Sequence, residues 1–213
     1  MLADPLNAGQ PHELRPEPHQ HRPPQARTAP RRRLLRPRHP SGYSAHDLIS
    51  LGFKHSPAHA ALLADTKSIA DVDVNNYDAL FVAGGQAPMV TFPKHTALQQ
   101  LVARFYETGK VTALVCHATC LLLEATLSDG SPLVQHKTWT GFADSEERVA
   151  DAAVGQRIQP FWIETEARAL PNTNFVVDQP FRAFAVRDGL LVTGQQQVSG
   201  TAAARLVVDA LGR

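Results

Sequence analysis

The chain of 213 residues contains only two cysteines, few aromatic side chains and no long hydrophobic run. Cys116 and Cys120 are four positions apart, so a disulfide between them could not join distant parts of a fold. No apolar run approaches the roughly 20 residues that a membrane span needs. The start of the chain also lacks the basic and apolar segments of a secretory signal. We therefore predict free thiols, a cytoplasmic location and no membrane partner.

The formal net charge of +1 hides an uneven distribution along the chain. Residues 1–40 hold eight arginines against three acidic residues, and nine of the sixteen prolines. This segment has no apolar periodicity, so we predict a disordered Pro/Arg/His-rich leader at 1–40, followed by one α/β domain at 41–213. The cluster Arg31-Arg32-Arg33 could contact nucleic acid, but such runs are usually solvated tails. No nucleic-acid partner is predicted.

The most informative stretch is the end of an apolar, β-branched run at 111–115, which stops at Cys116. Residues 118–125 favour a helix. This pattern predicts a buried strand that turns sharply into a helix with a thiol at the corner. The free N–H groups of a helix N-terminus favour a thiolate, which is the nucleophilic form of cysteine. The alternative is a buried cysteine that only fills space in the core.

A second strand end, at 77–82, is followed by Gly84 and Gly85. Apolar residues with helical spacing at 96–108 separate it from the strand that ends at Cys116, so the two strands predict a right-handed βαβ unit. The carboxyl ends of parallel strands meet at one edge of a sheet, where ligands bind. We therefore expect Gly84 and Gly85 near Cys116, where their backbone could hold an oxyanion. A plain strand-to-loop turn is the alternative.

The rest of the chain predicts a mixture of short helices and strands. Strands are expected at 138–142 and 175–177, a hairpin at 184–193, and helices at 58–64, 144–149, 161–170 and 202–211. His55 and His59 are four apart but have no third ligand nearby in the sequence, so no metal site is predicted.

Together these segments resemble the ThiJ/PfpI superfamily, also called class I glutamine amidotransferase-like, over about residues 40–213. More narrowly, the chain resembles the glyoxalase III branch, whose members are also described as holding chaperones and protein deglycases. The segments that carry the resemblance are 77–85, 113–117, 127–133, 140–147 and 188–195. The resemblance implies an α/β, flavodoxin-like three-layer sandwich with a mostly parallel sheet.

The resemblance also implies the residues of the site and their roles. Cys116 would be the nucleophile, His117 its partner, and Glu147 or alternatively Glu146 the acid that orients the histidine. Gly84 and Gly85 would bind the substrate and its oxyanion, and no cofactor is implied. Without the resemblance, the two glutamates would be read as a solvated helix face.

Three departures from the family pattern stand out. The family elbow usually reads Cys-His-Gly-Pro, whereas this chain has Cys116-His117-Ala118-Thr119, and Gln86 replaces a histidine after the two glycines. The family also begins with a strand and a helix whose glutamate acts as a base, but residues 1–40 contain no such strand. Their two glutamates, Glu13 and Glu17, are not assigned this role. The first strand is thus missing or replaced, and we hypothesise that the leader results from out-of-frame or mis-started translation.

The function implied by the resemblance is cofactor-independent conversion of a 2-oxoaldehyde, such as methylglyoxal, into a 2-hydroxy acid. Loss of the N-terminal glutamate would impair it. One alternative is a non-enzymatic holding chaperone or redox-sensing stress protein. Another is a cysteine-dependent hydrolase or hydratase. A true glutamine amidotransferase is disfavoured because no downstream His-x-Glu pair completes its triad. The expected partner is a small aldehyde, and assembly as a homodimer is kept open.

Overall fold

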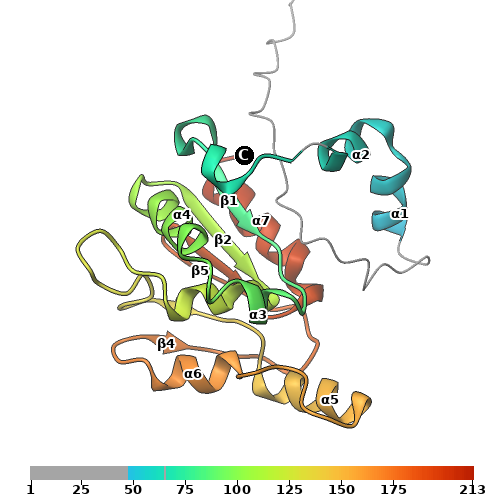
Figure 1. Ribbon diagram of the computed structural model, residues 1–213, viewed down its shortest axis with the longest axis vertical. Coiled ribbons are helices and arrows are strands. Elements are labelled where there is room, and N and C mark those ends of the chain that lie inside the picture. The colour runs from blue at the N-terminus through green and yellow to red at the C-terminus, as the bar shows by residue number, and fades with distance from the viewer. Residues whose placement is uncertain (1–47, 65) are drawn as a thin grey trace, which may run out of the picture.

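The computed structural model describes residues 48–64 and 66–213, and its main feature is a four-stranded sheet (Figure 1). The predicted leader at 1–40 lies outside the described residues. The order of strands in the sheet is β1-β2-β6-β5. Strands β1, β2 and β6 are parallel to one another, and β5 is antiparallel to β6. The mostly parallel sheet is confirmed. The four strands are β1 (Ala79–Val82), β2 (Val111–Val115), β5 (Ala185–Asp188) and β6 (Leu191–Gly194).

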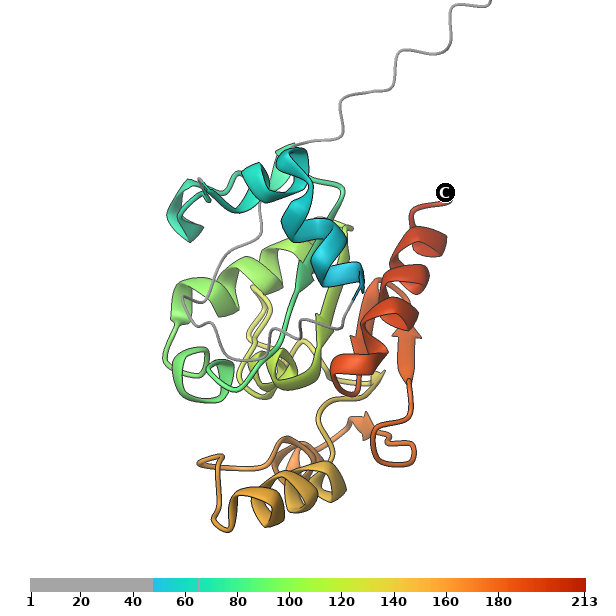
Figure 2. The ribbon, with the colours of Figure 1, turned by 90° about the vertical axis from the view of Figure 1, so that its right-hand side faces the viewer.

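Two amphipathic helices cover the opposite faces of this sheet. Helix α4 (Thr96–Glu107) connects β1 to β2, and helix α7 (Gly200–Ala210) packs on β6 and β2. Figure 2 shows the sheet between these two helices. The chain therefore has the three layers of a flavodoxin-like α/β sandwich, as the resemblance implied.

The centre of the sheet is the best-buried part of the described structure. All five residues of β2 are buried, because the strand has neighbours on both sides and a helix over each face. Strand β1, in contrast, is only half-buried and has β2 as its single neighbour among the described strands. Among the described strands, β2, which leads to Cys116, is therefore more buried and has more neighbours than β1, which leads to the glycines.

The remaining elements lie around the sheet. Helices α5 and α6 lie beside β4 at the lower end in Figure 1, where β4 pairs in parallel with β3. These remaining elements are α1 (Leu48–His55), α2 (Pro57–Ala64), η1 (Ile69–Asp71), η2 (Val74–Asn76), α3 (Pro88–Thr91), η3 (Cys116–Leu123), β3 (Thr138–Trp139), α5 (Asp144–Val154), α6 (Ile163–Ala169), β4 (Asn174–Phe175) and η4 (Gln197–Ser199). No helix in the described part of the chain is both long and apolar enough to cross a bilayer.

The structure corrects several expected boundaries. The helix expected at 118–125 is a 3-10 helix, which begins earlier, at Cys116 itself, and ends at Leu123. Helix α5 extends five residues beyond the expected 149, because Gly155 in the left-handed conformation (φ 80°) is what ends it. The strands expected at 138–142 and 175–177 shrink to the two-residue strands β3 and β4.

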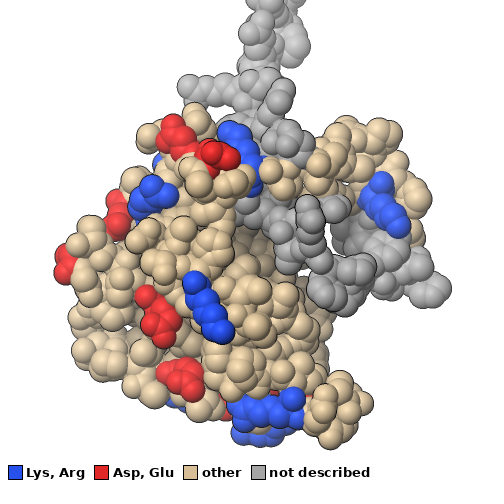
Figure 3. Space-filling model, viewed as in Figure 1, with Lys and Arg blue, Asp and Glu red and all other residues tan. Residues whose placement is uncertain are grey.

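Charged side chains are unevenly spread over the surface. Figure 3 shows basic side chains gathered at the lower end of the visible face, over α5. In this region the guanidinium groups of Arg148 and Arg157 lie 5.2 and 4.8 Å from the centroid of the Trp162 ring. These contacts are cation–π interactions and fix the loop after α5 against the start of α6.

Candidate active site

The first feature of the site is a strained turn at the end of β2. Cys116 has a φ of 63°, a left-handed conformation that residues with a Cβ rarely adopt. The hydroxyl of Thr119 donates a hydrogen bond of 2.7 Å to the carbonyl oxygen of Cys116, which holds the turn closed. Backbone strain of this kind is concentrated at functional sites. Cys116 itself is buried, with 7% of its surface exposed.

The loop after β1 packs directly against this turn. A Cβ atom on Gly84 would lie 2.7 Å from the Cβ of Cys116 and 2.6 Å from the carbonyl oxygen of Val115. Only glycine allows this approach. Gly85 has a φ of 122°, which a side chain would also disfavour, and it is exposed beside the turn. The structure therefore brings together the two strand ends that the sequence singled out.

The imidazole of His117 connects the thiol to a carboxylate. Its Nδ1 atom lies 3.6 Å from the Sγ of Cys116, and its Nε2 atom lies 3.0 Å from Oε1 of Glu147. The ring also stacks on Phe142, with 4.1 Å between centroids and an angle of 20° between planes. Both His117 and Glu147 are buried. The three side chains thus form a fixed Cys–His–Glu row from β2 and η3 to α5.

The groups on either side of the imidazole, Cys116 and Glu147, favour the protonated form of His117. Burial alone would lower the pKa of His117, but hydrogen bonds and charge interactions with Cys116 and Glu147 outweigh it and raise the pKa to about 9. At neutral pH an imidazolium therefore lies between the sulfur and the carboxylate. A cation beside the sulfur is the arrangement that activates cysteine nucleophiles.

The two glutamates at the start of α5 have different surroundings. Glu147 reaches His117, whereas Glu146 accepts hydrogen bonds from the backbone N–H groups of Ala143 (3.0 Å) and Phe181 (2.8 Å). Glu146 also accepts one from the side chain of Gln195 at 3.0 Å. It therefore ties three segments together and does not face the thiol. Glu147 is the partner of the histidine in this geometry, and its second oxygen is buried without a hydrogen-bond partner in the described part of the chain.

Some neighbours of the site carry no signal in the sequence alone. Phe142 and Thr119 are ordinary core residues until the fold places them against the histidine and the turn. The side chain of Gln86 accepts a hydrogen bond from the buried Gln159, which ties the glycine loop to the segment after α5. Gln86 and Gln159 are 73 residues apart, so no local sequence pattern predicts their contact. Within residues 48–64 and 66–213, no cluster of three potential ligands could hold a metal ion.

The fold and the site define a class of protein. These are α/β proteins in which a central parallel strand ends at a cysteine on a strained turn, with a histidine next to it. Residues 54–210 match the DJ-1/PfpI family, and the chain belongs to this family. Among curated relatives, the probable glutathione-independent glyoxalase hsp3103 of Schizosaccharomyces pombe is 35% identical, covering 70% of this chain and 59% of the relative. Glyoxalase 3 of Candida albicans is 29% identical, covering 70% of this chain and 64% of the relative.

A solved structure agrees with these sequence relatives. The crystal structure of glyoxalase III from Candida albicans superposes with a TM-score of 0.63 at 26% identity, covering 75% of this chain and 67% of that one. The chain spans less than two thirds of the length of hsp3103 and of glyoxalase 3, at 59% and 64%. The comparisons therefore establish the family and the glyoxalase III-like branch.

Proposed function

We propose that this chain is a glutathione-independent glyoxalase that converts a small 2-oxoaldehyde, such as methylglyoxal, into a 2-hydroxy acid without an added cofactor. The observation that carries the proposal is the row formed by Cys116, His117 and Glu147 at a turn packed against Gly84. Relatives named as glyoxalases, at 29% and 35% identity, favour this chemistry over the chaperone and hydrolase alternatives. A small aldehyde is accordingly the proposed partner.

The first step is addition of the Cys116 thiolate to the aldehyde carbon. A carbon–sulfur bond forms, and the electron pair of the carbonyl moves to its oxygen. The backbone N–H groups of Gly85 and His117 stabilise this oxyanion. The imidazolium of His117 then gives it a proton, which yields a neutral hemithioacetal and a neutral imidazole.

The second step moves a proton between two carbons. Neutral His117, oriented by Glu147, removes the hydrogen from the carbon bound to sulfur, and its imidazolium gives the proton to the oxygen of the neighbouring carbonyl, so an enediol results. His117 then takes the hydroxyl proton from the sulfur-bearing carbon and delivers it to the neighbouring carbon, which leaves the thioester of a 2-hydroxy acid on Cys116. Water hydrolyses this thioester and restores the thiol. The net change is the addition of one water molecule, so neither an oxidant nor a reductant is needed.

His117 carries all the proton transfers in this scheme, because no other residue in the described part of the chain is assigned the role of a dedicated base. We therefore expect turnover to be slow compared with an enzyme that has one, because a positioned base contributes about 10²–10⁴-fold.

The test is formation of lactate from methylglyoxal by the purified chain in the absence of glutathione. We expect the wild-type protein to produce lactate and Cys116→Ala to produce none above the background without protein. Thermal unfolding and circular dichroism of the variant serve as the control for folding. Equal rates for the wild type and Cys116→Ala would reject the mechanism.

We also propose a cellular location, a domain boundary and an oligomeric state for this chain. A cytoplasmic location is proposed because Cys116 and Cys120 are both free thiols, which a reducing compartment maintains. A domain boundary near residue 40 follows from the change in composition, and a homodimer is an assembly that light scattering of the purified chain can test.

A further inference from the structure

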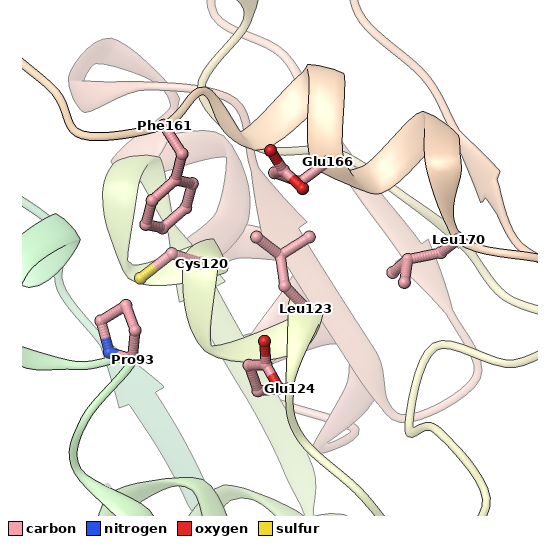
Figure 4. Close-up of a pocket in the computed structure, with 7 residues that line it drawn as sticks. All are labelled: Pro93, Cys120, Leu123, Glu124, Phe161, Glu166 and Leu170. Atoms are coloured by element: carbon pink, nitrogen blue, oxygen red, sulfur yellow. The ribbon is translucent and has the colours of Figure 1, made fainter.

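A pocket separate from the cysteine turn lies between η3, α6 and the segment that follows α3 (Figure 4). Its volume is about 340 Å³, at the lower end of the range for small-molecule sites. The catalytic candidates Cys116, His117 and Glu147 are not among its lining residues. The pocket is lined by Pro93, Cys120, Leu123, Glu124, Phe161, Glu166 and Leu170.

About half of the pocket wall is apolar, and Phe161, Leu123 and Leu170 contribute to this half. In Figure 4 the ring of Phe161 lies over Cys120, the side chain of Leu123 lies to one side of it, and Leu170 is at the far side. Burial raises the pKa of the Cys120 thiol to about 12, so this thiol stays neutral and behaves as part of the apolar wall. Its hydrogen bond to the carbonyl oxygen of Pro88 holds it in place. Such a wall favours an aromatic or aliphatic ligand body.

Two carboxylates provide the charge of the pocket. Glu124 comes from the end of η3 and Glu166 from α6, and Figure 4 shows them on opposite sides of Leu123. Both residues are exposed, and neither carboxylate has a hydrogen bond or ion pair with any of the described residues. On the same helix, by contrast, Glu164 forms an ion pair of 2.7 Å with Arg168. The pocket therefore has two uncompensated negative charges beside an apolar wall.

We propose that this pocket binds a small molecule with a cationic amine on an apolar body. The apolar body would cover Phe161 and Leu123, and the ammonium group would approach Glu124 and Glu166. An anion of the same shape would be repelled by the two carboxylates. A neutral molecule would gain only the apolar contacts. Charge complementarity thus selects the amine.

The test compares three probes of matched length by calorimetry with the full chain. These are 4-phenylbutylamine, 4-phenylbutanol and 4-phenylbutyrate, which share a phenyl ring on a four-carbon chain and end in a cationic, a neutral and an anionic group. We expect saturable 1:1 binding of the amine, binding of the alcohol about threefold to tenfold weaker, and no measurable binding of the carboxylate. The affinity for the amine should fall as salt is raised, because the carboxylates are exposed.

Variants separate this pocket from other sites. Glu124→Gln and Glu166→Gln should each weaken binding of the amine by about threefold to tenfold, since each removes one charge. Asp209→Asn is the matched control, because Asp209 is an exposed acid on α7 that does not line the pocket. Cys116→Ala should bind the amine as tightly as the wild type, whatever its glyoxalase activity.

Four outcomes would overturn the proposal. These are the absence of saturable binding at millimolar amine, equal binding of the alcohol or the carboxylate, unchanged affinity in both glutamine variants, and loss of binding in Cys116→Ala. The last outcome would place the amine at the cysteine turn instead.

Discussion

The ion pair between His117 and Glu147 can be tested by a change that removes charge but little volume. Glu147→Gln keeps the length of the side chain and replaces the carboxylate that lies 3.0 Å from Nε2 of His117. The pKa of His117 should then fall, because one of the two groups that raise it is gone. A nearby opposite charge is worth about 1–3 pKa units, so we expect a fall of about one to two.

The same pair makes stability depend on pH in a defined direction. The pKa of His117 is raised from 6.5 to about 9 in the folded chain, which corresponds to about 3 kcal/mol of stability. Because the folded pKa is the higher one, this stability is fully present below pH 6.5 and is lost as the pH rises through 9. In Glu147→Gln about half or more of this pH dependence should disappear, in line with the expected fall in the pKa of His117.

Denaturant unfolding at pH 6 and pH 9.5 measures this difference, and NMR titration of the His117 ring measures the pKa itself. The amide of the variant puts an unpaired donor where Glu147 has an unpaired oxygen, and an unpaired buried group costs about 1–3 kcal/mol. That cost is the same at both pH values. The difference in the free energy of unfolding between pH 6 and pH 9.5 therefore reports on the His117–Glu147 pair alone. Glu166→Gln, which removes an exposed charge, controls for the change in net charge.

One result would refute this reasoning. If Glu147→Gln and the wild type lose the same stability between pH 6 and pH 9.5, the pair does not set the protonation of His117. A ring titration near pH 9 in the variant would lead to the same conclusion.

Two further substitutions test how the site is held. Gly84→Ala should destabilise the chain by about 1–3 kcal/mol, since its Cβ would lie 2.6 Å from a backbone oxygen and 2.7 Å from the Cβ of Cys116. Gly52→Ala, with no atom within 4 Å of its Cβ, is the matched control, and equal midpoints for the two in thermal unfolding would contradict the close approach. Glu146→Ala should cost about 2–4 kcal/mol in denaturant unfolding, because it leaves the N–H groups of Ala143 and Phe181 and the Gln195 amide without their acceptor. An unchanged midpoint for Glu146→Ala would show that water replaces the carboxylate.

The central strand and the hairpin could be predicted from the sequence because local patterns determine them. The β-branched run at 111–115 has the same bounds as β2, and the hairpin around Asp188-Gly189 forms β5 and β6. The parallel pairing of β1 with β2 follows from the helix between them. The meeting of Gly84 with Cys116 follows from that pairing, which is why both strand ends could be placed at one edge in advance.

Other features depend on contacts that no local pattern encodes. The sequence left Glu146 and Glu147 as alternatives, since only the path of the loop at Phe181 and the position of Gln195 turn Glu146 away from the histidine. Helix propensity predicted a helix at 118–125 but not its type or its start, because the turn at Cys116 and its closure by Thr119 give a 3-10 helix that starts at the cysteine. The short helix α3 was missed because it is one turn long.

Strands β1 and β2 have different numbers of neighbours among the described strands, and this difference affects the order in which the site unfolds. The thiol follows a strand with a neighbour on each side, whereas Gly84 and Gly85 follow a strand with one neighbour among those described. Ladders at a sheet edge open by local fluctuation more readily than those at the centre. Amide protons of β1 should therefore exchange with solvent before those of β2. Gentle heating would then detach the glycines from the sulfur while most of the core is still folded, and the chain would lose its competent site before its secondary structure.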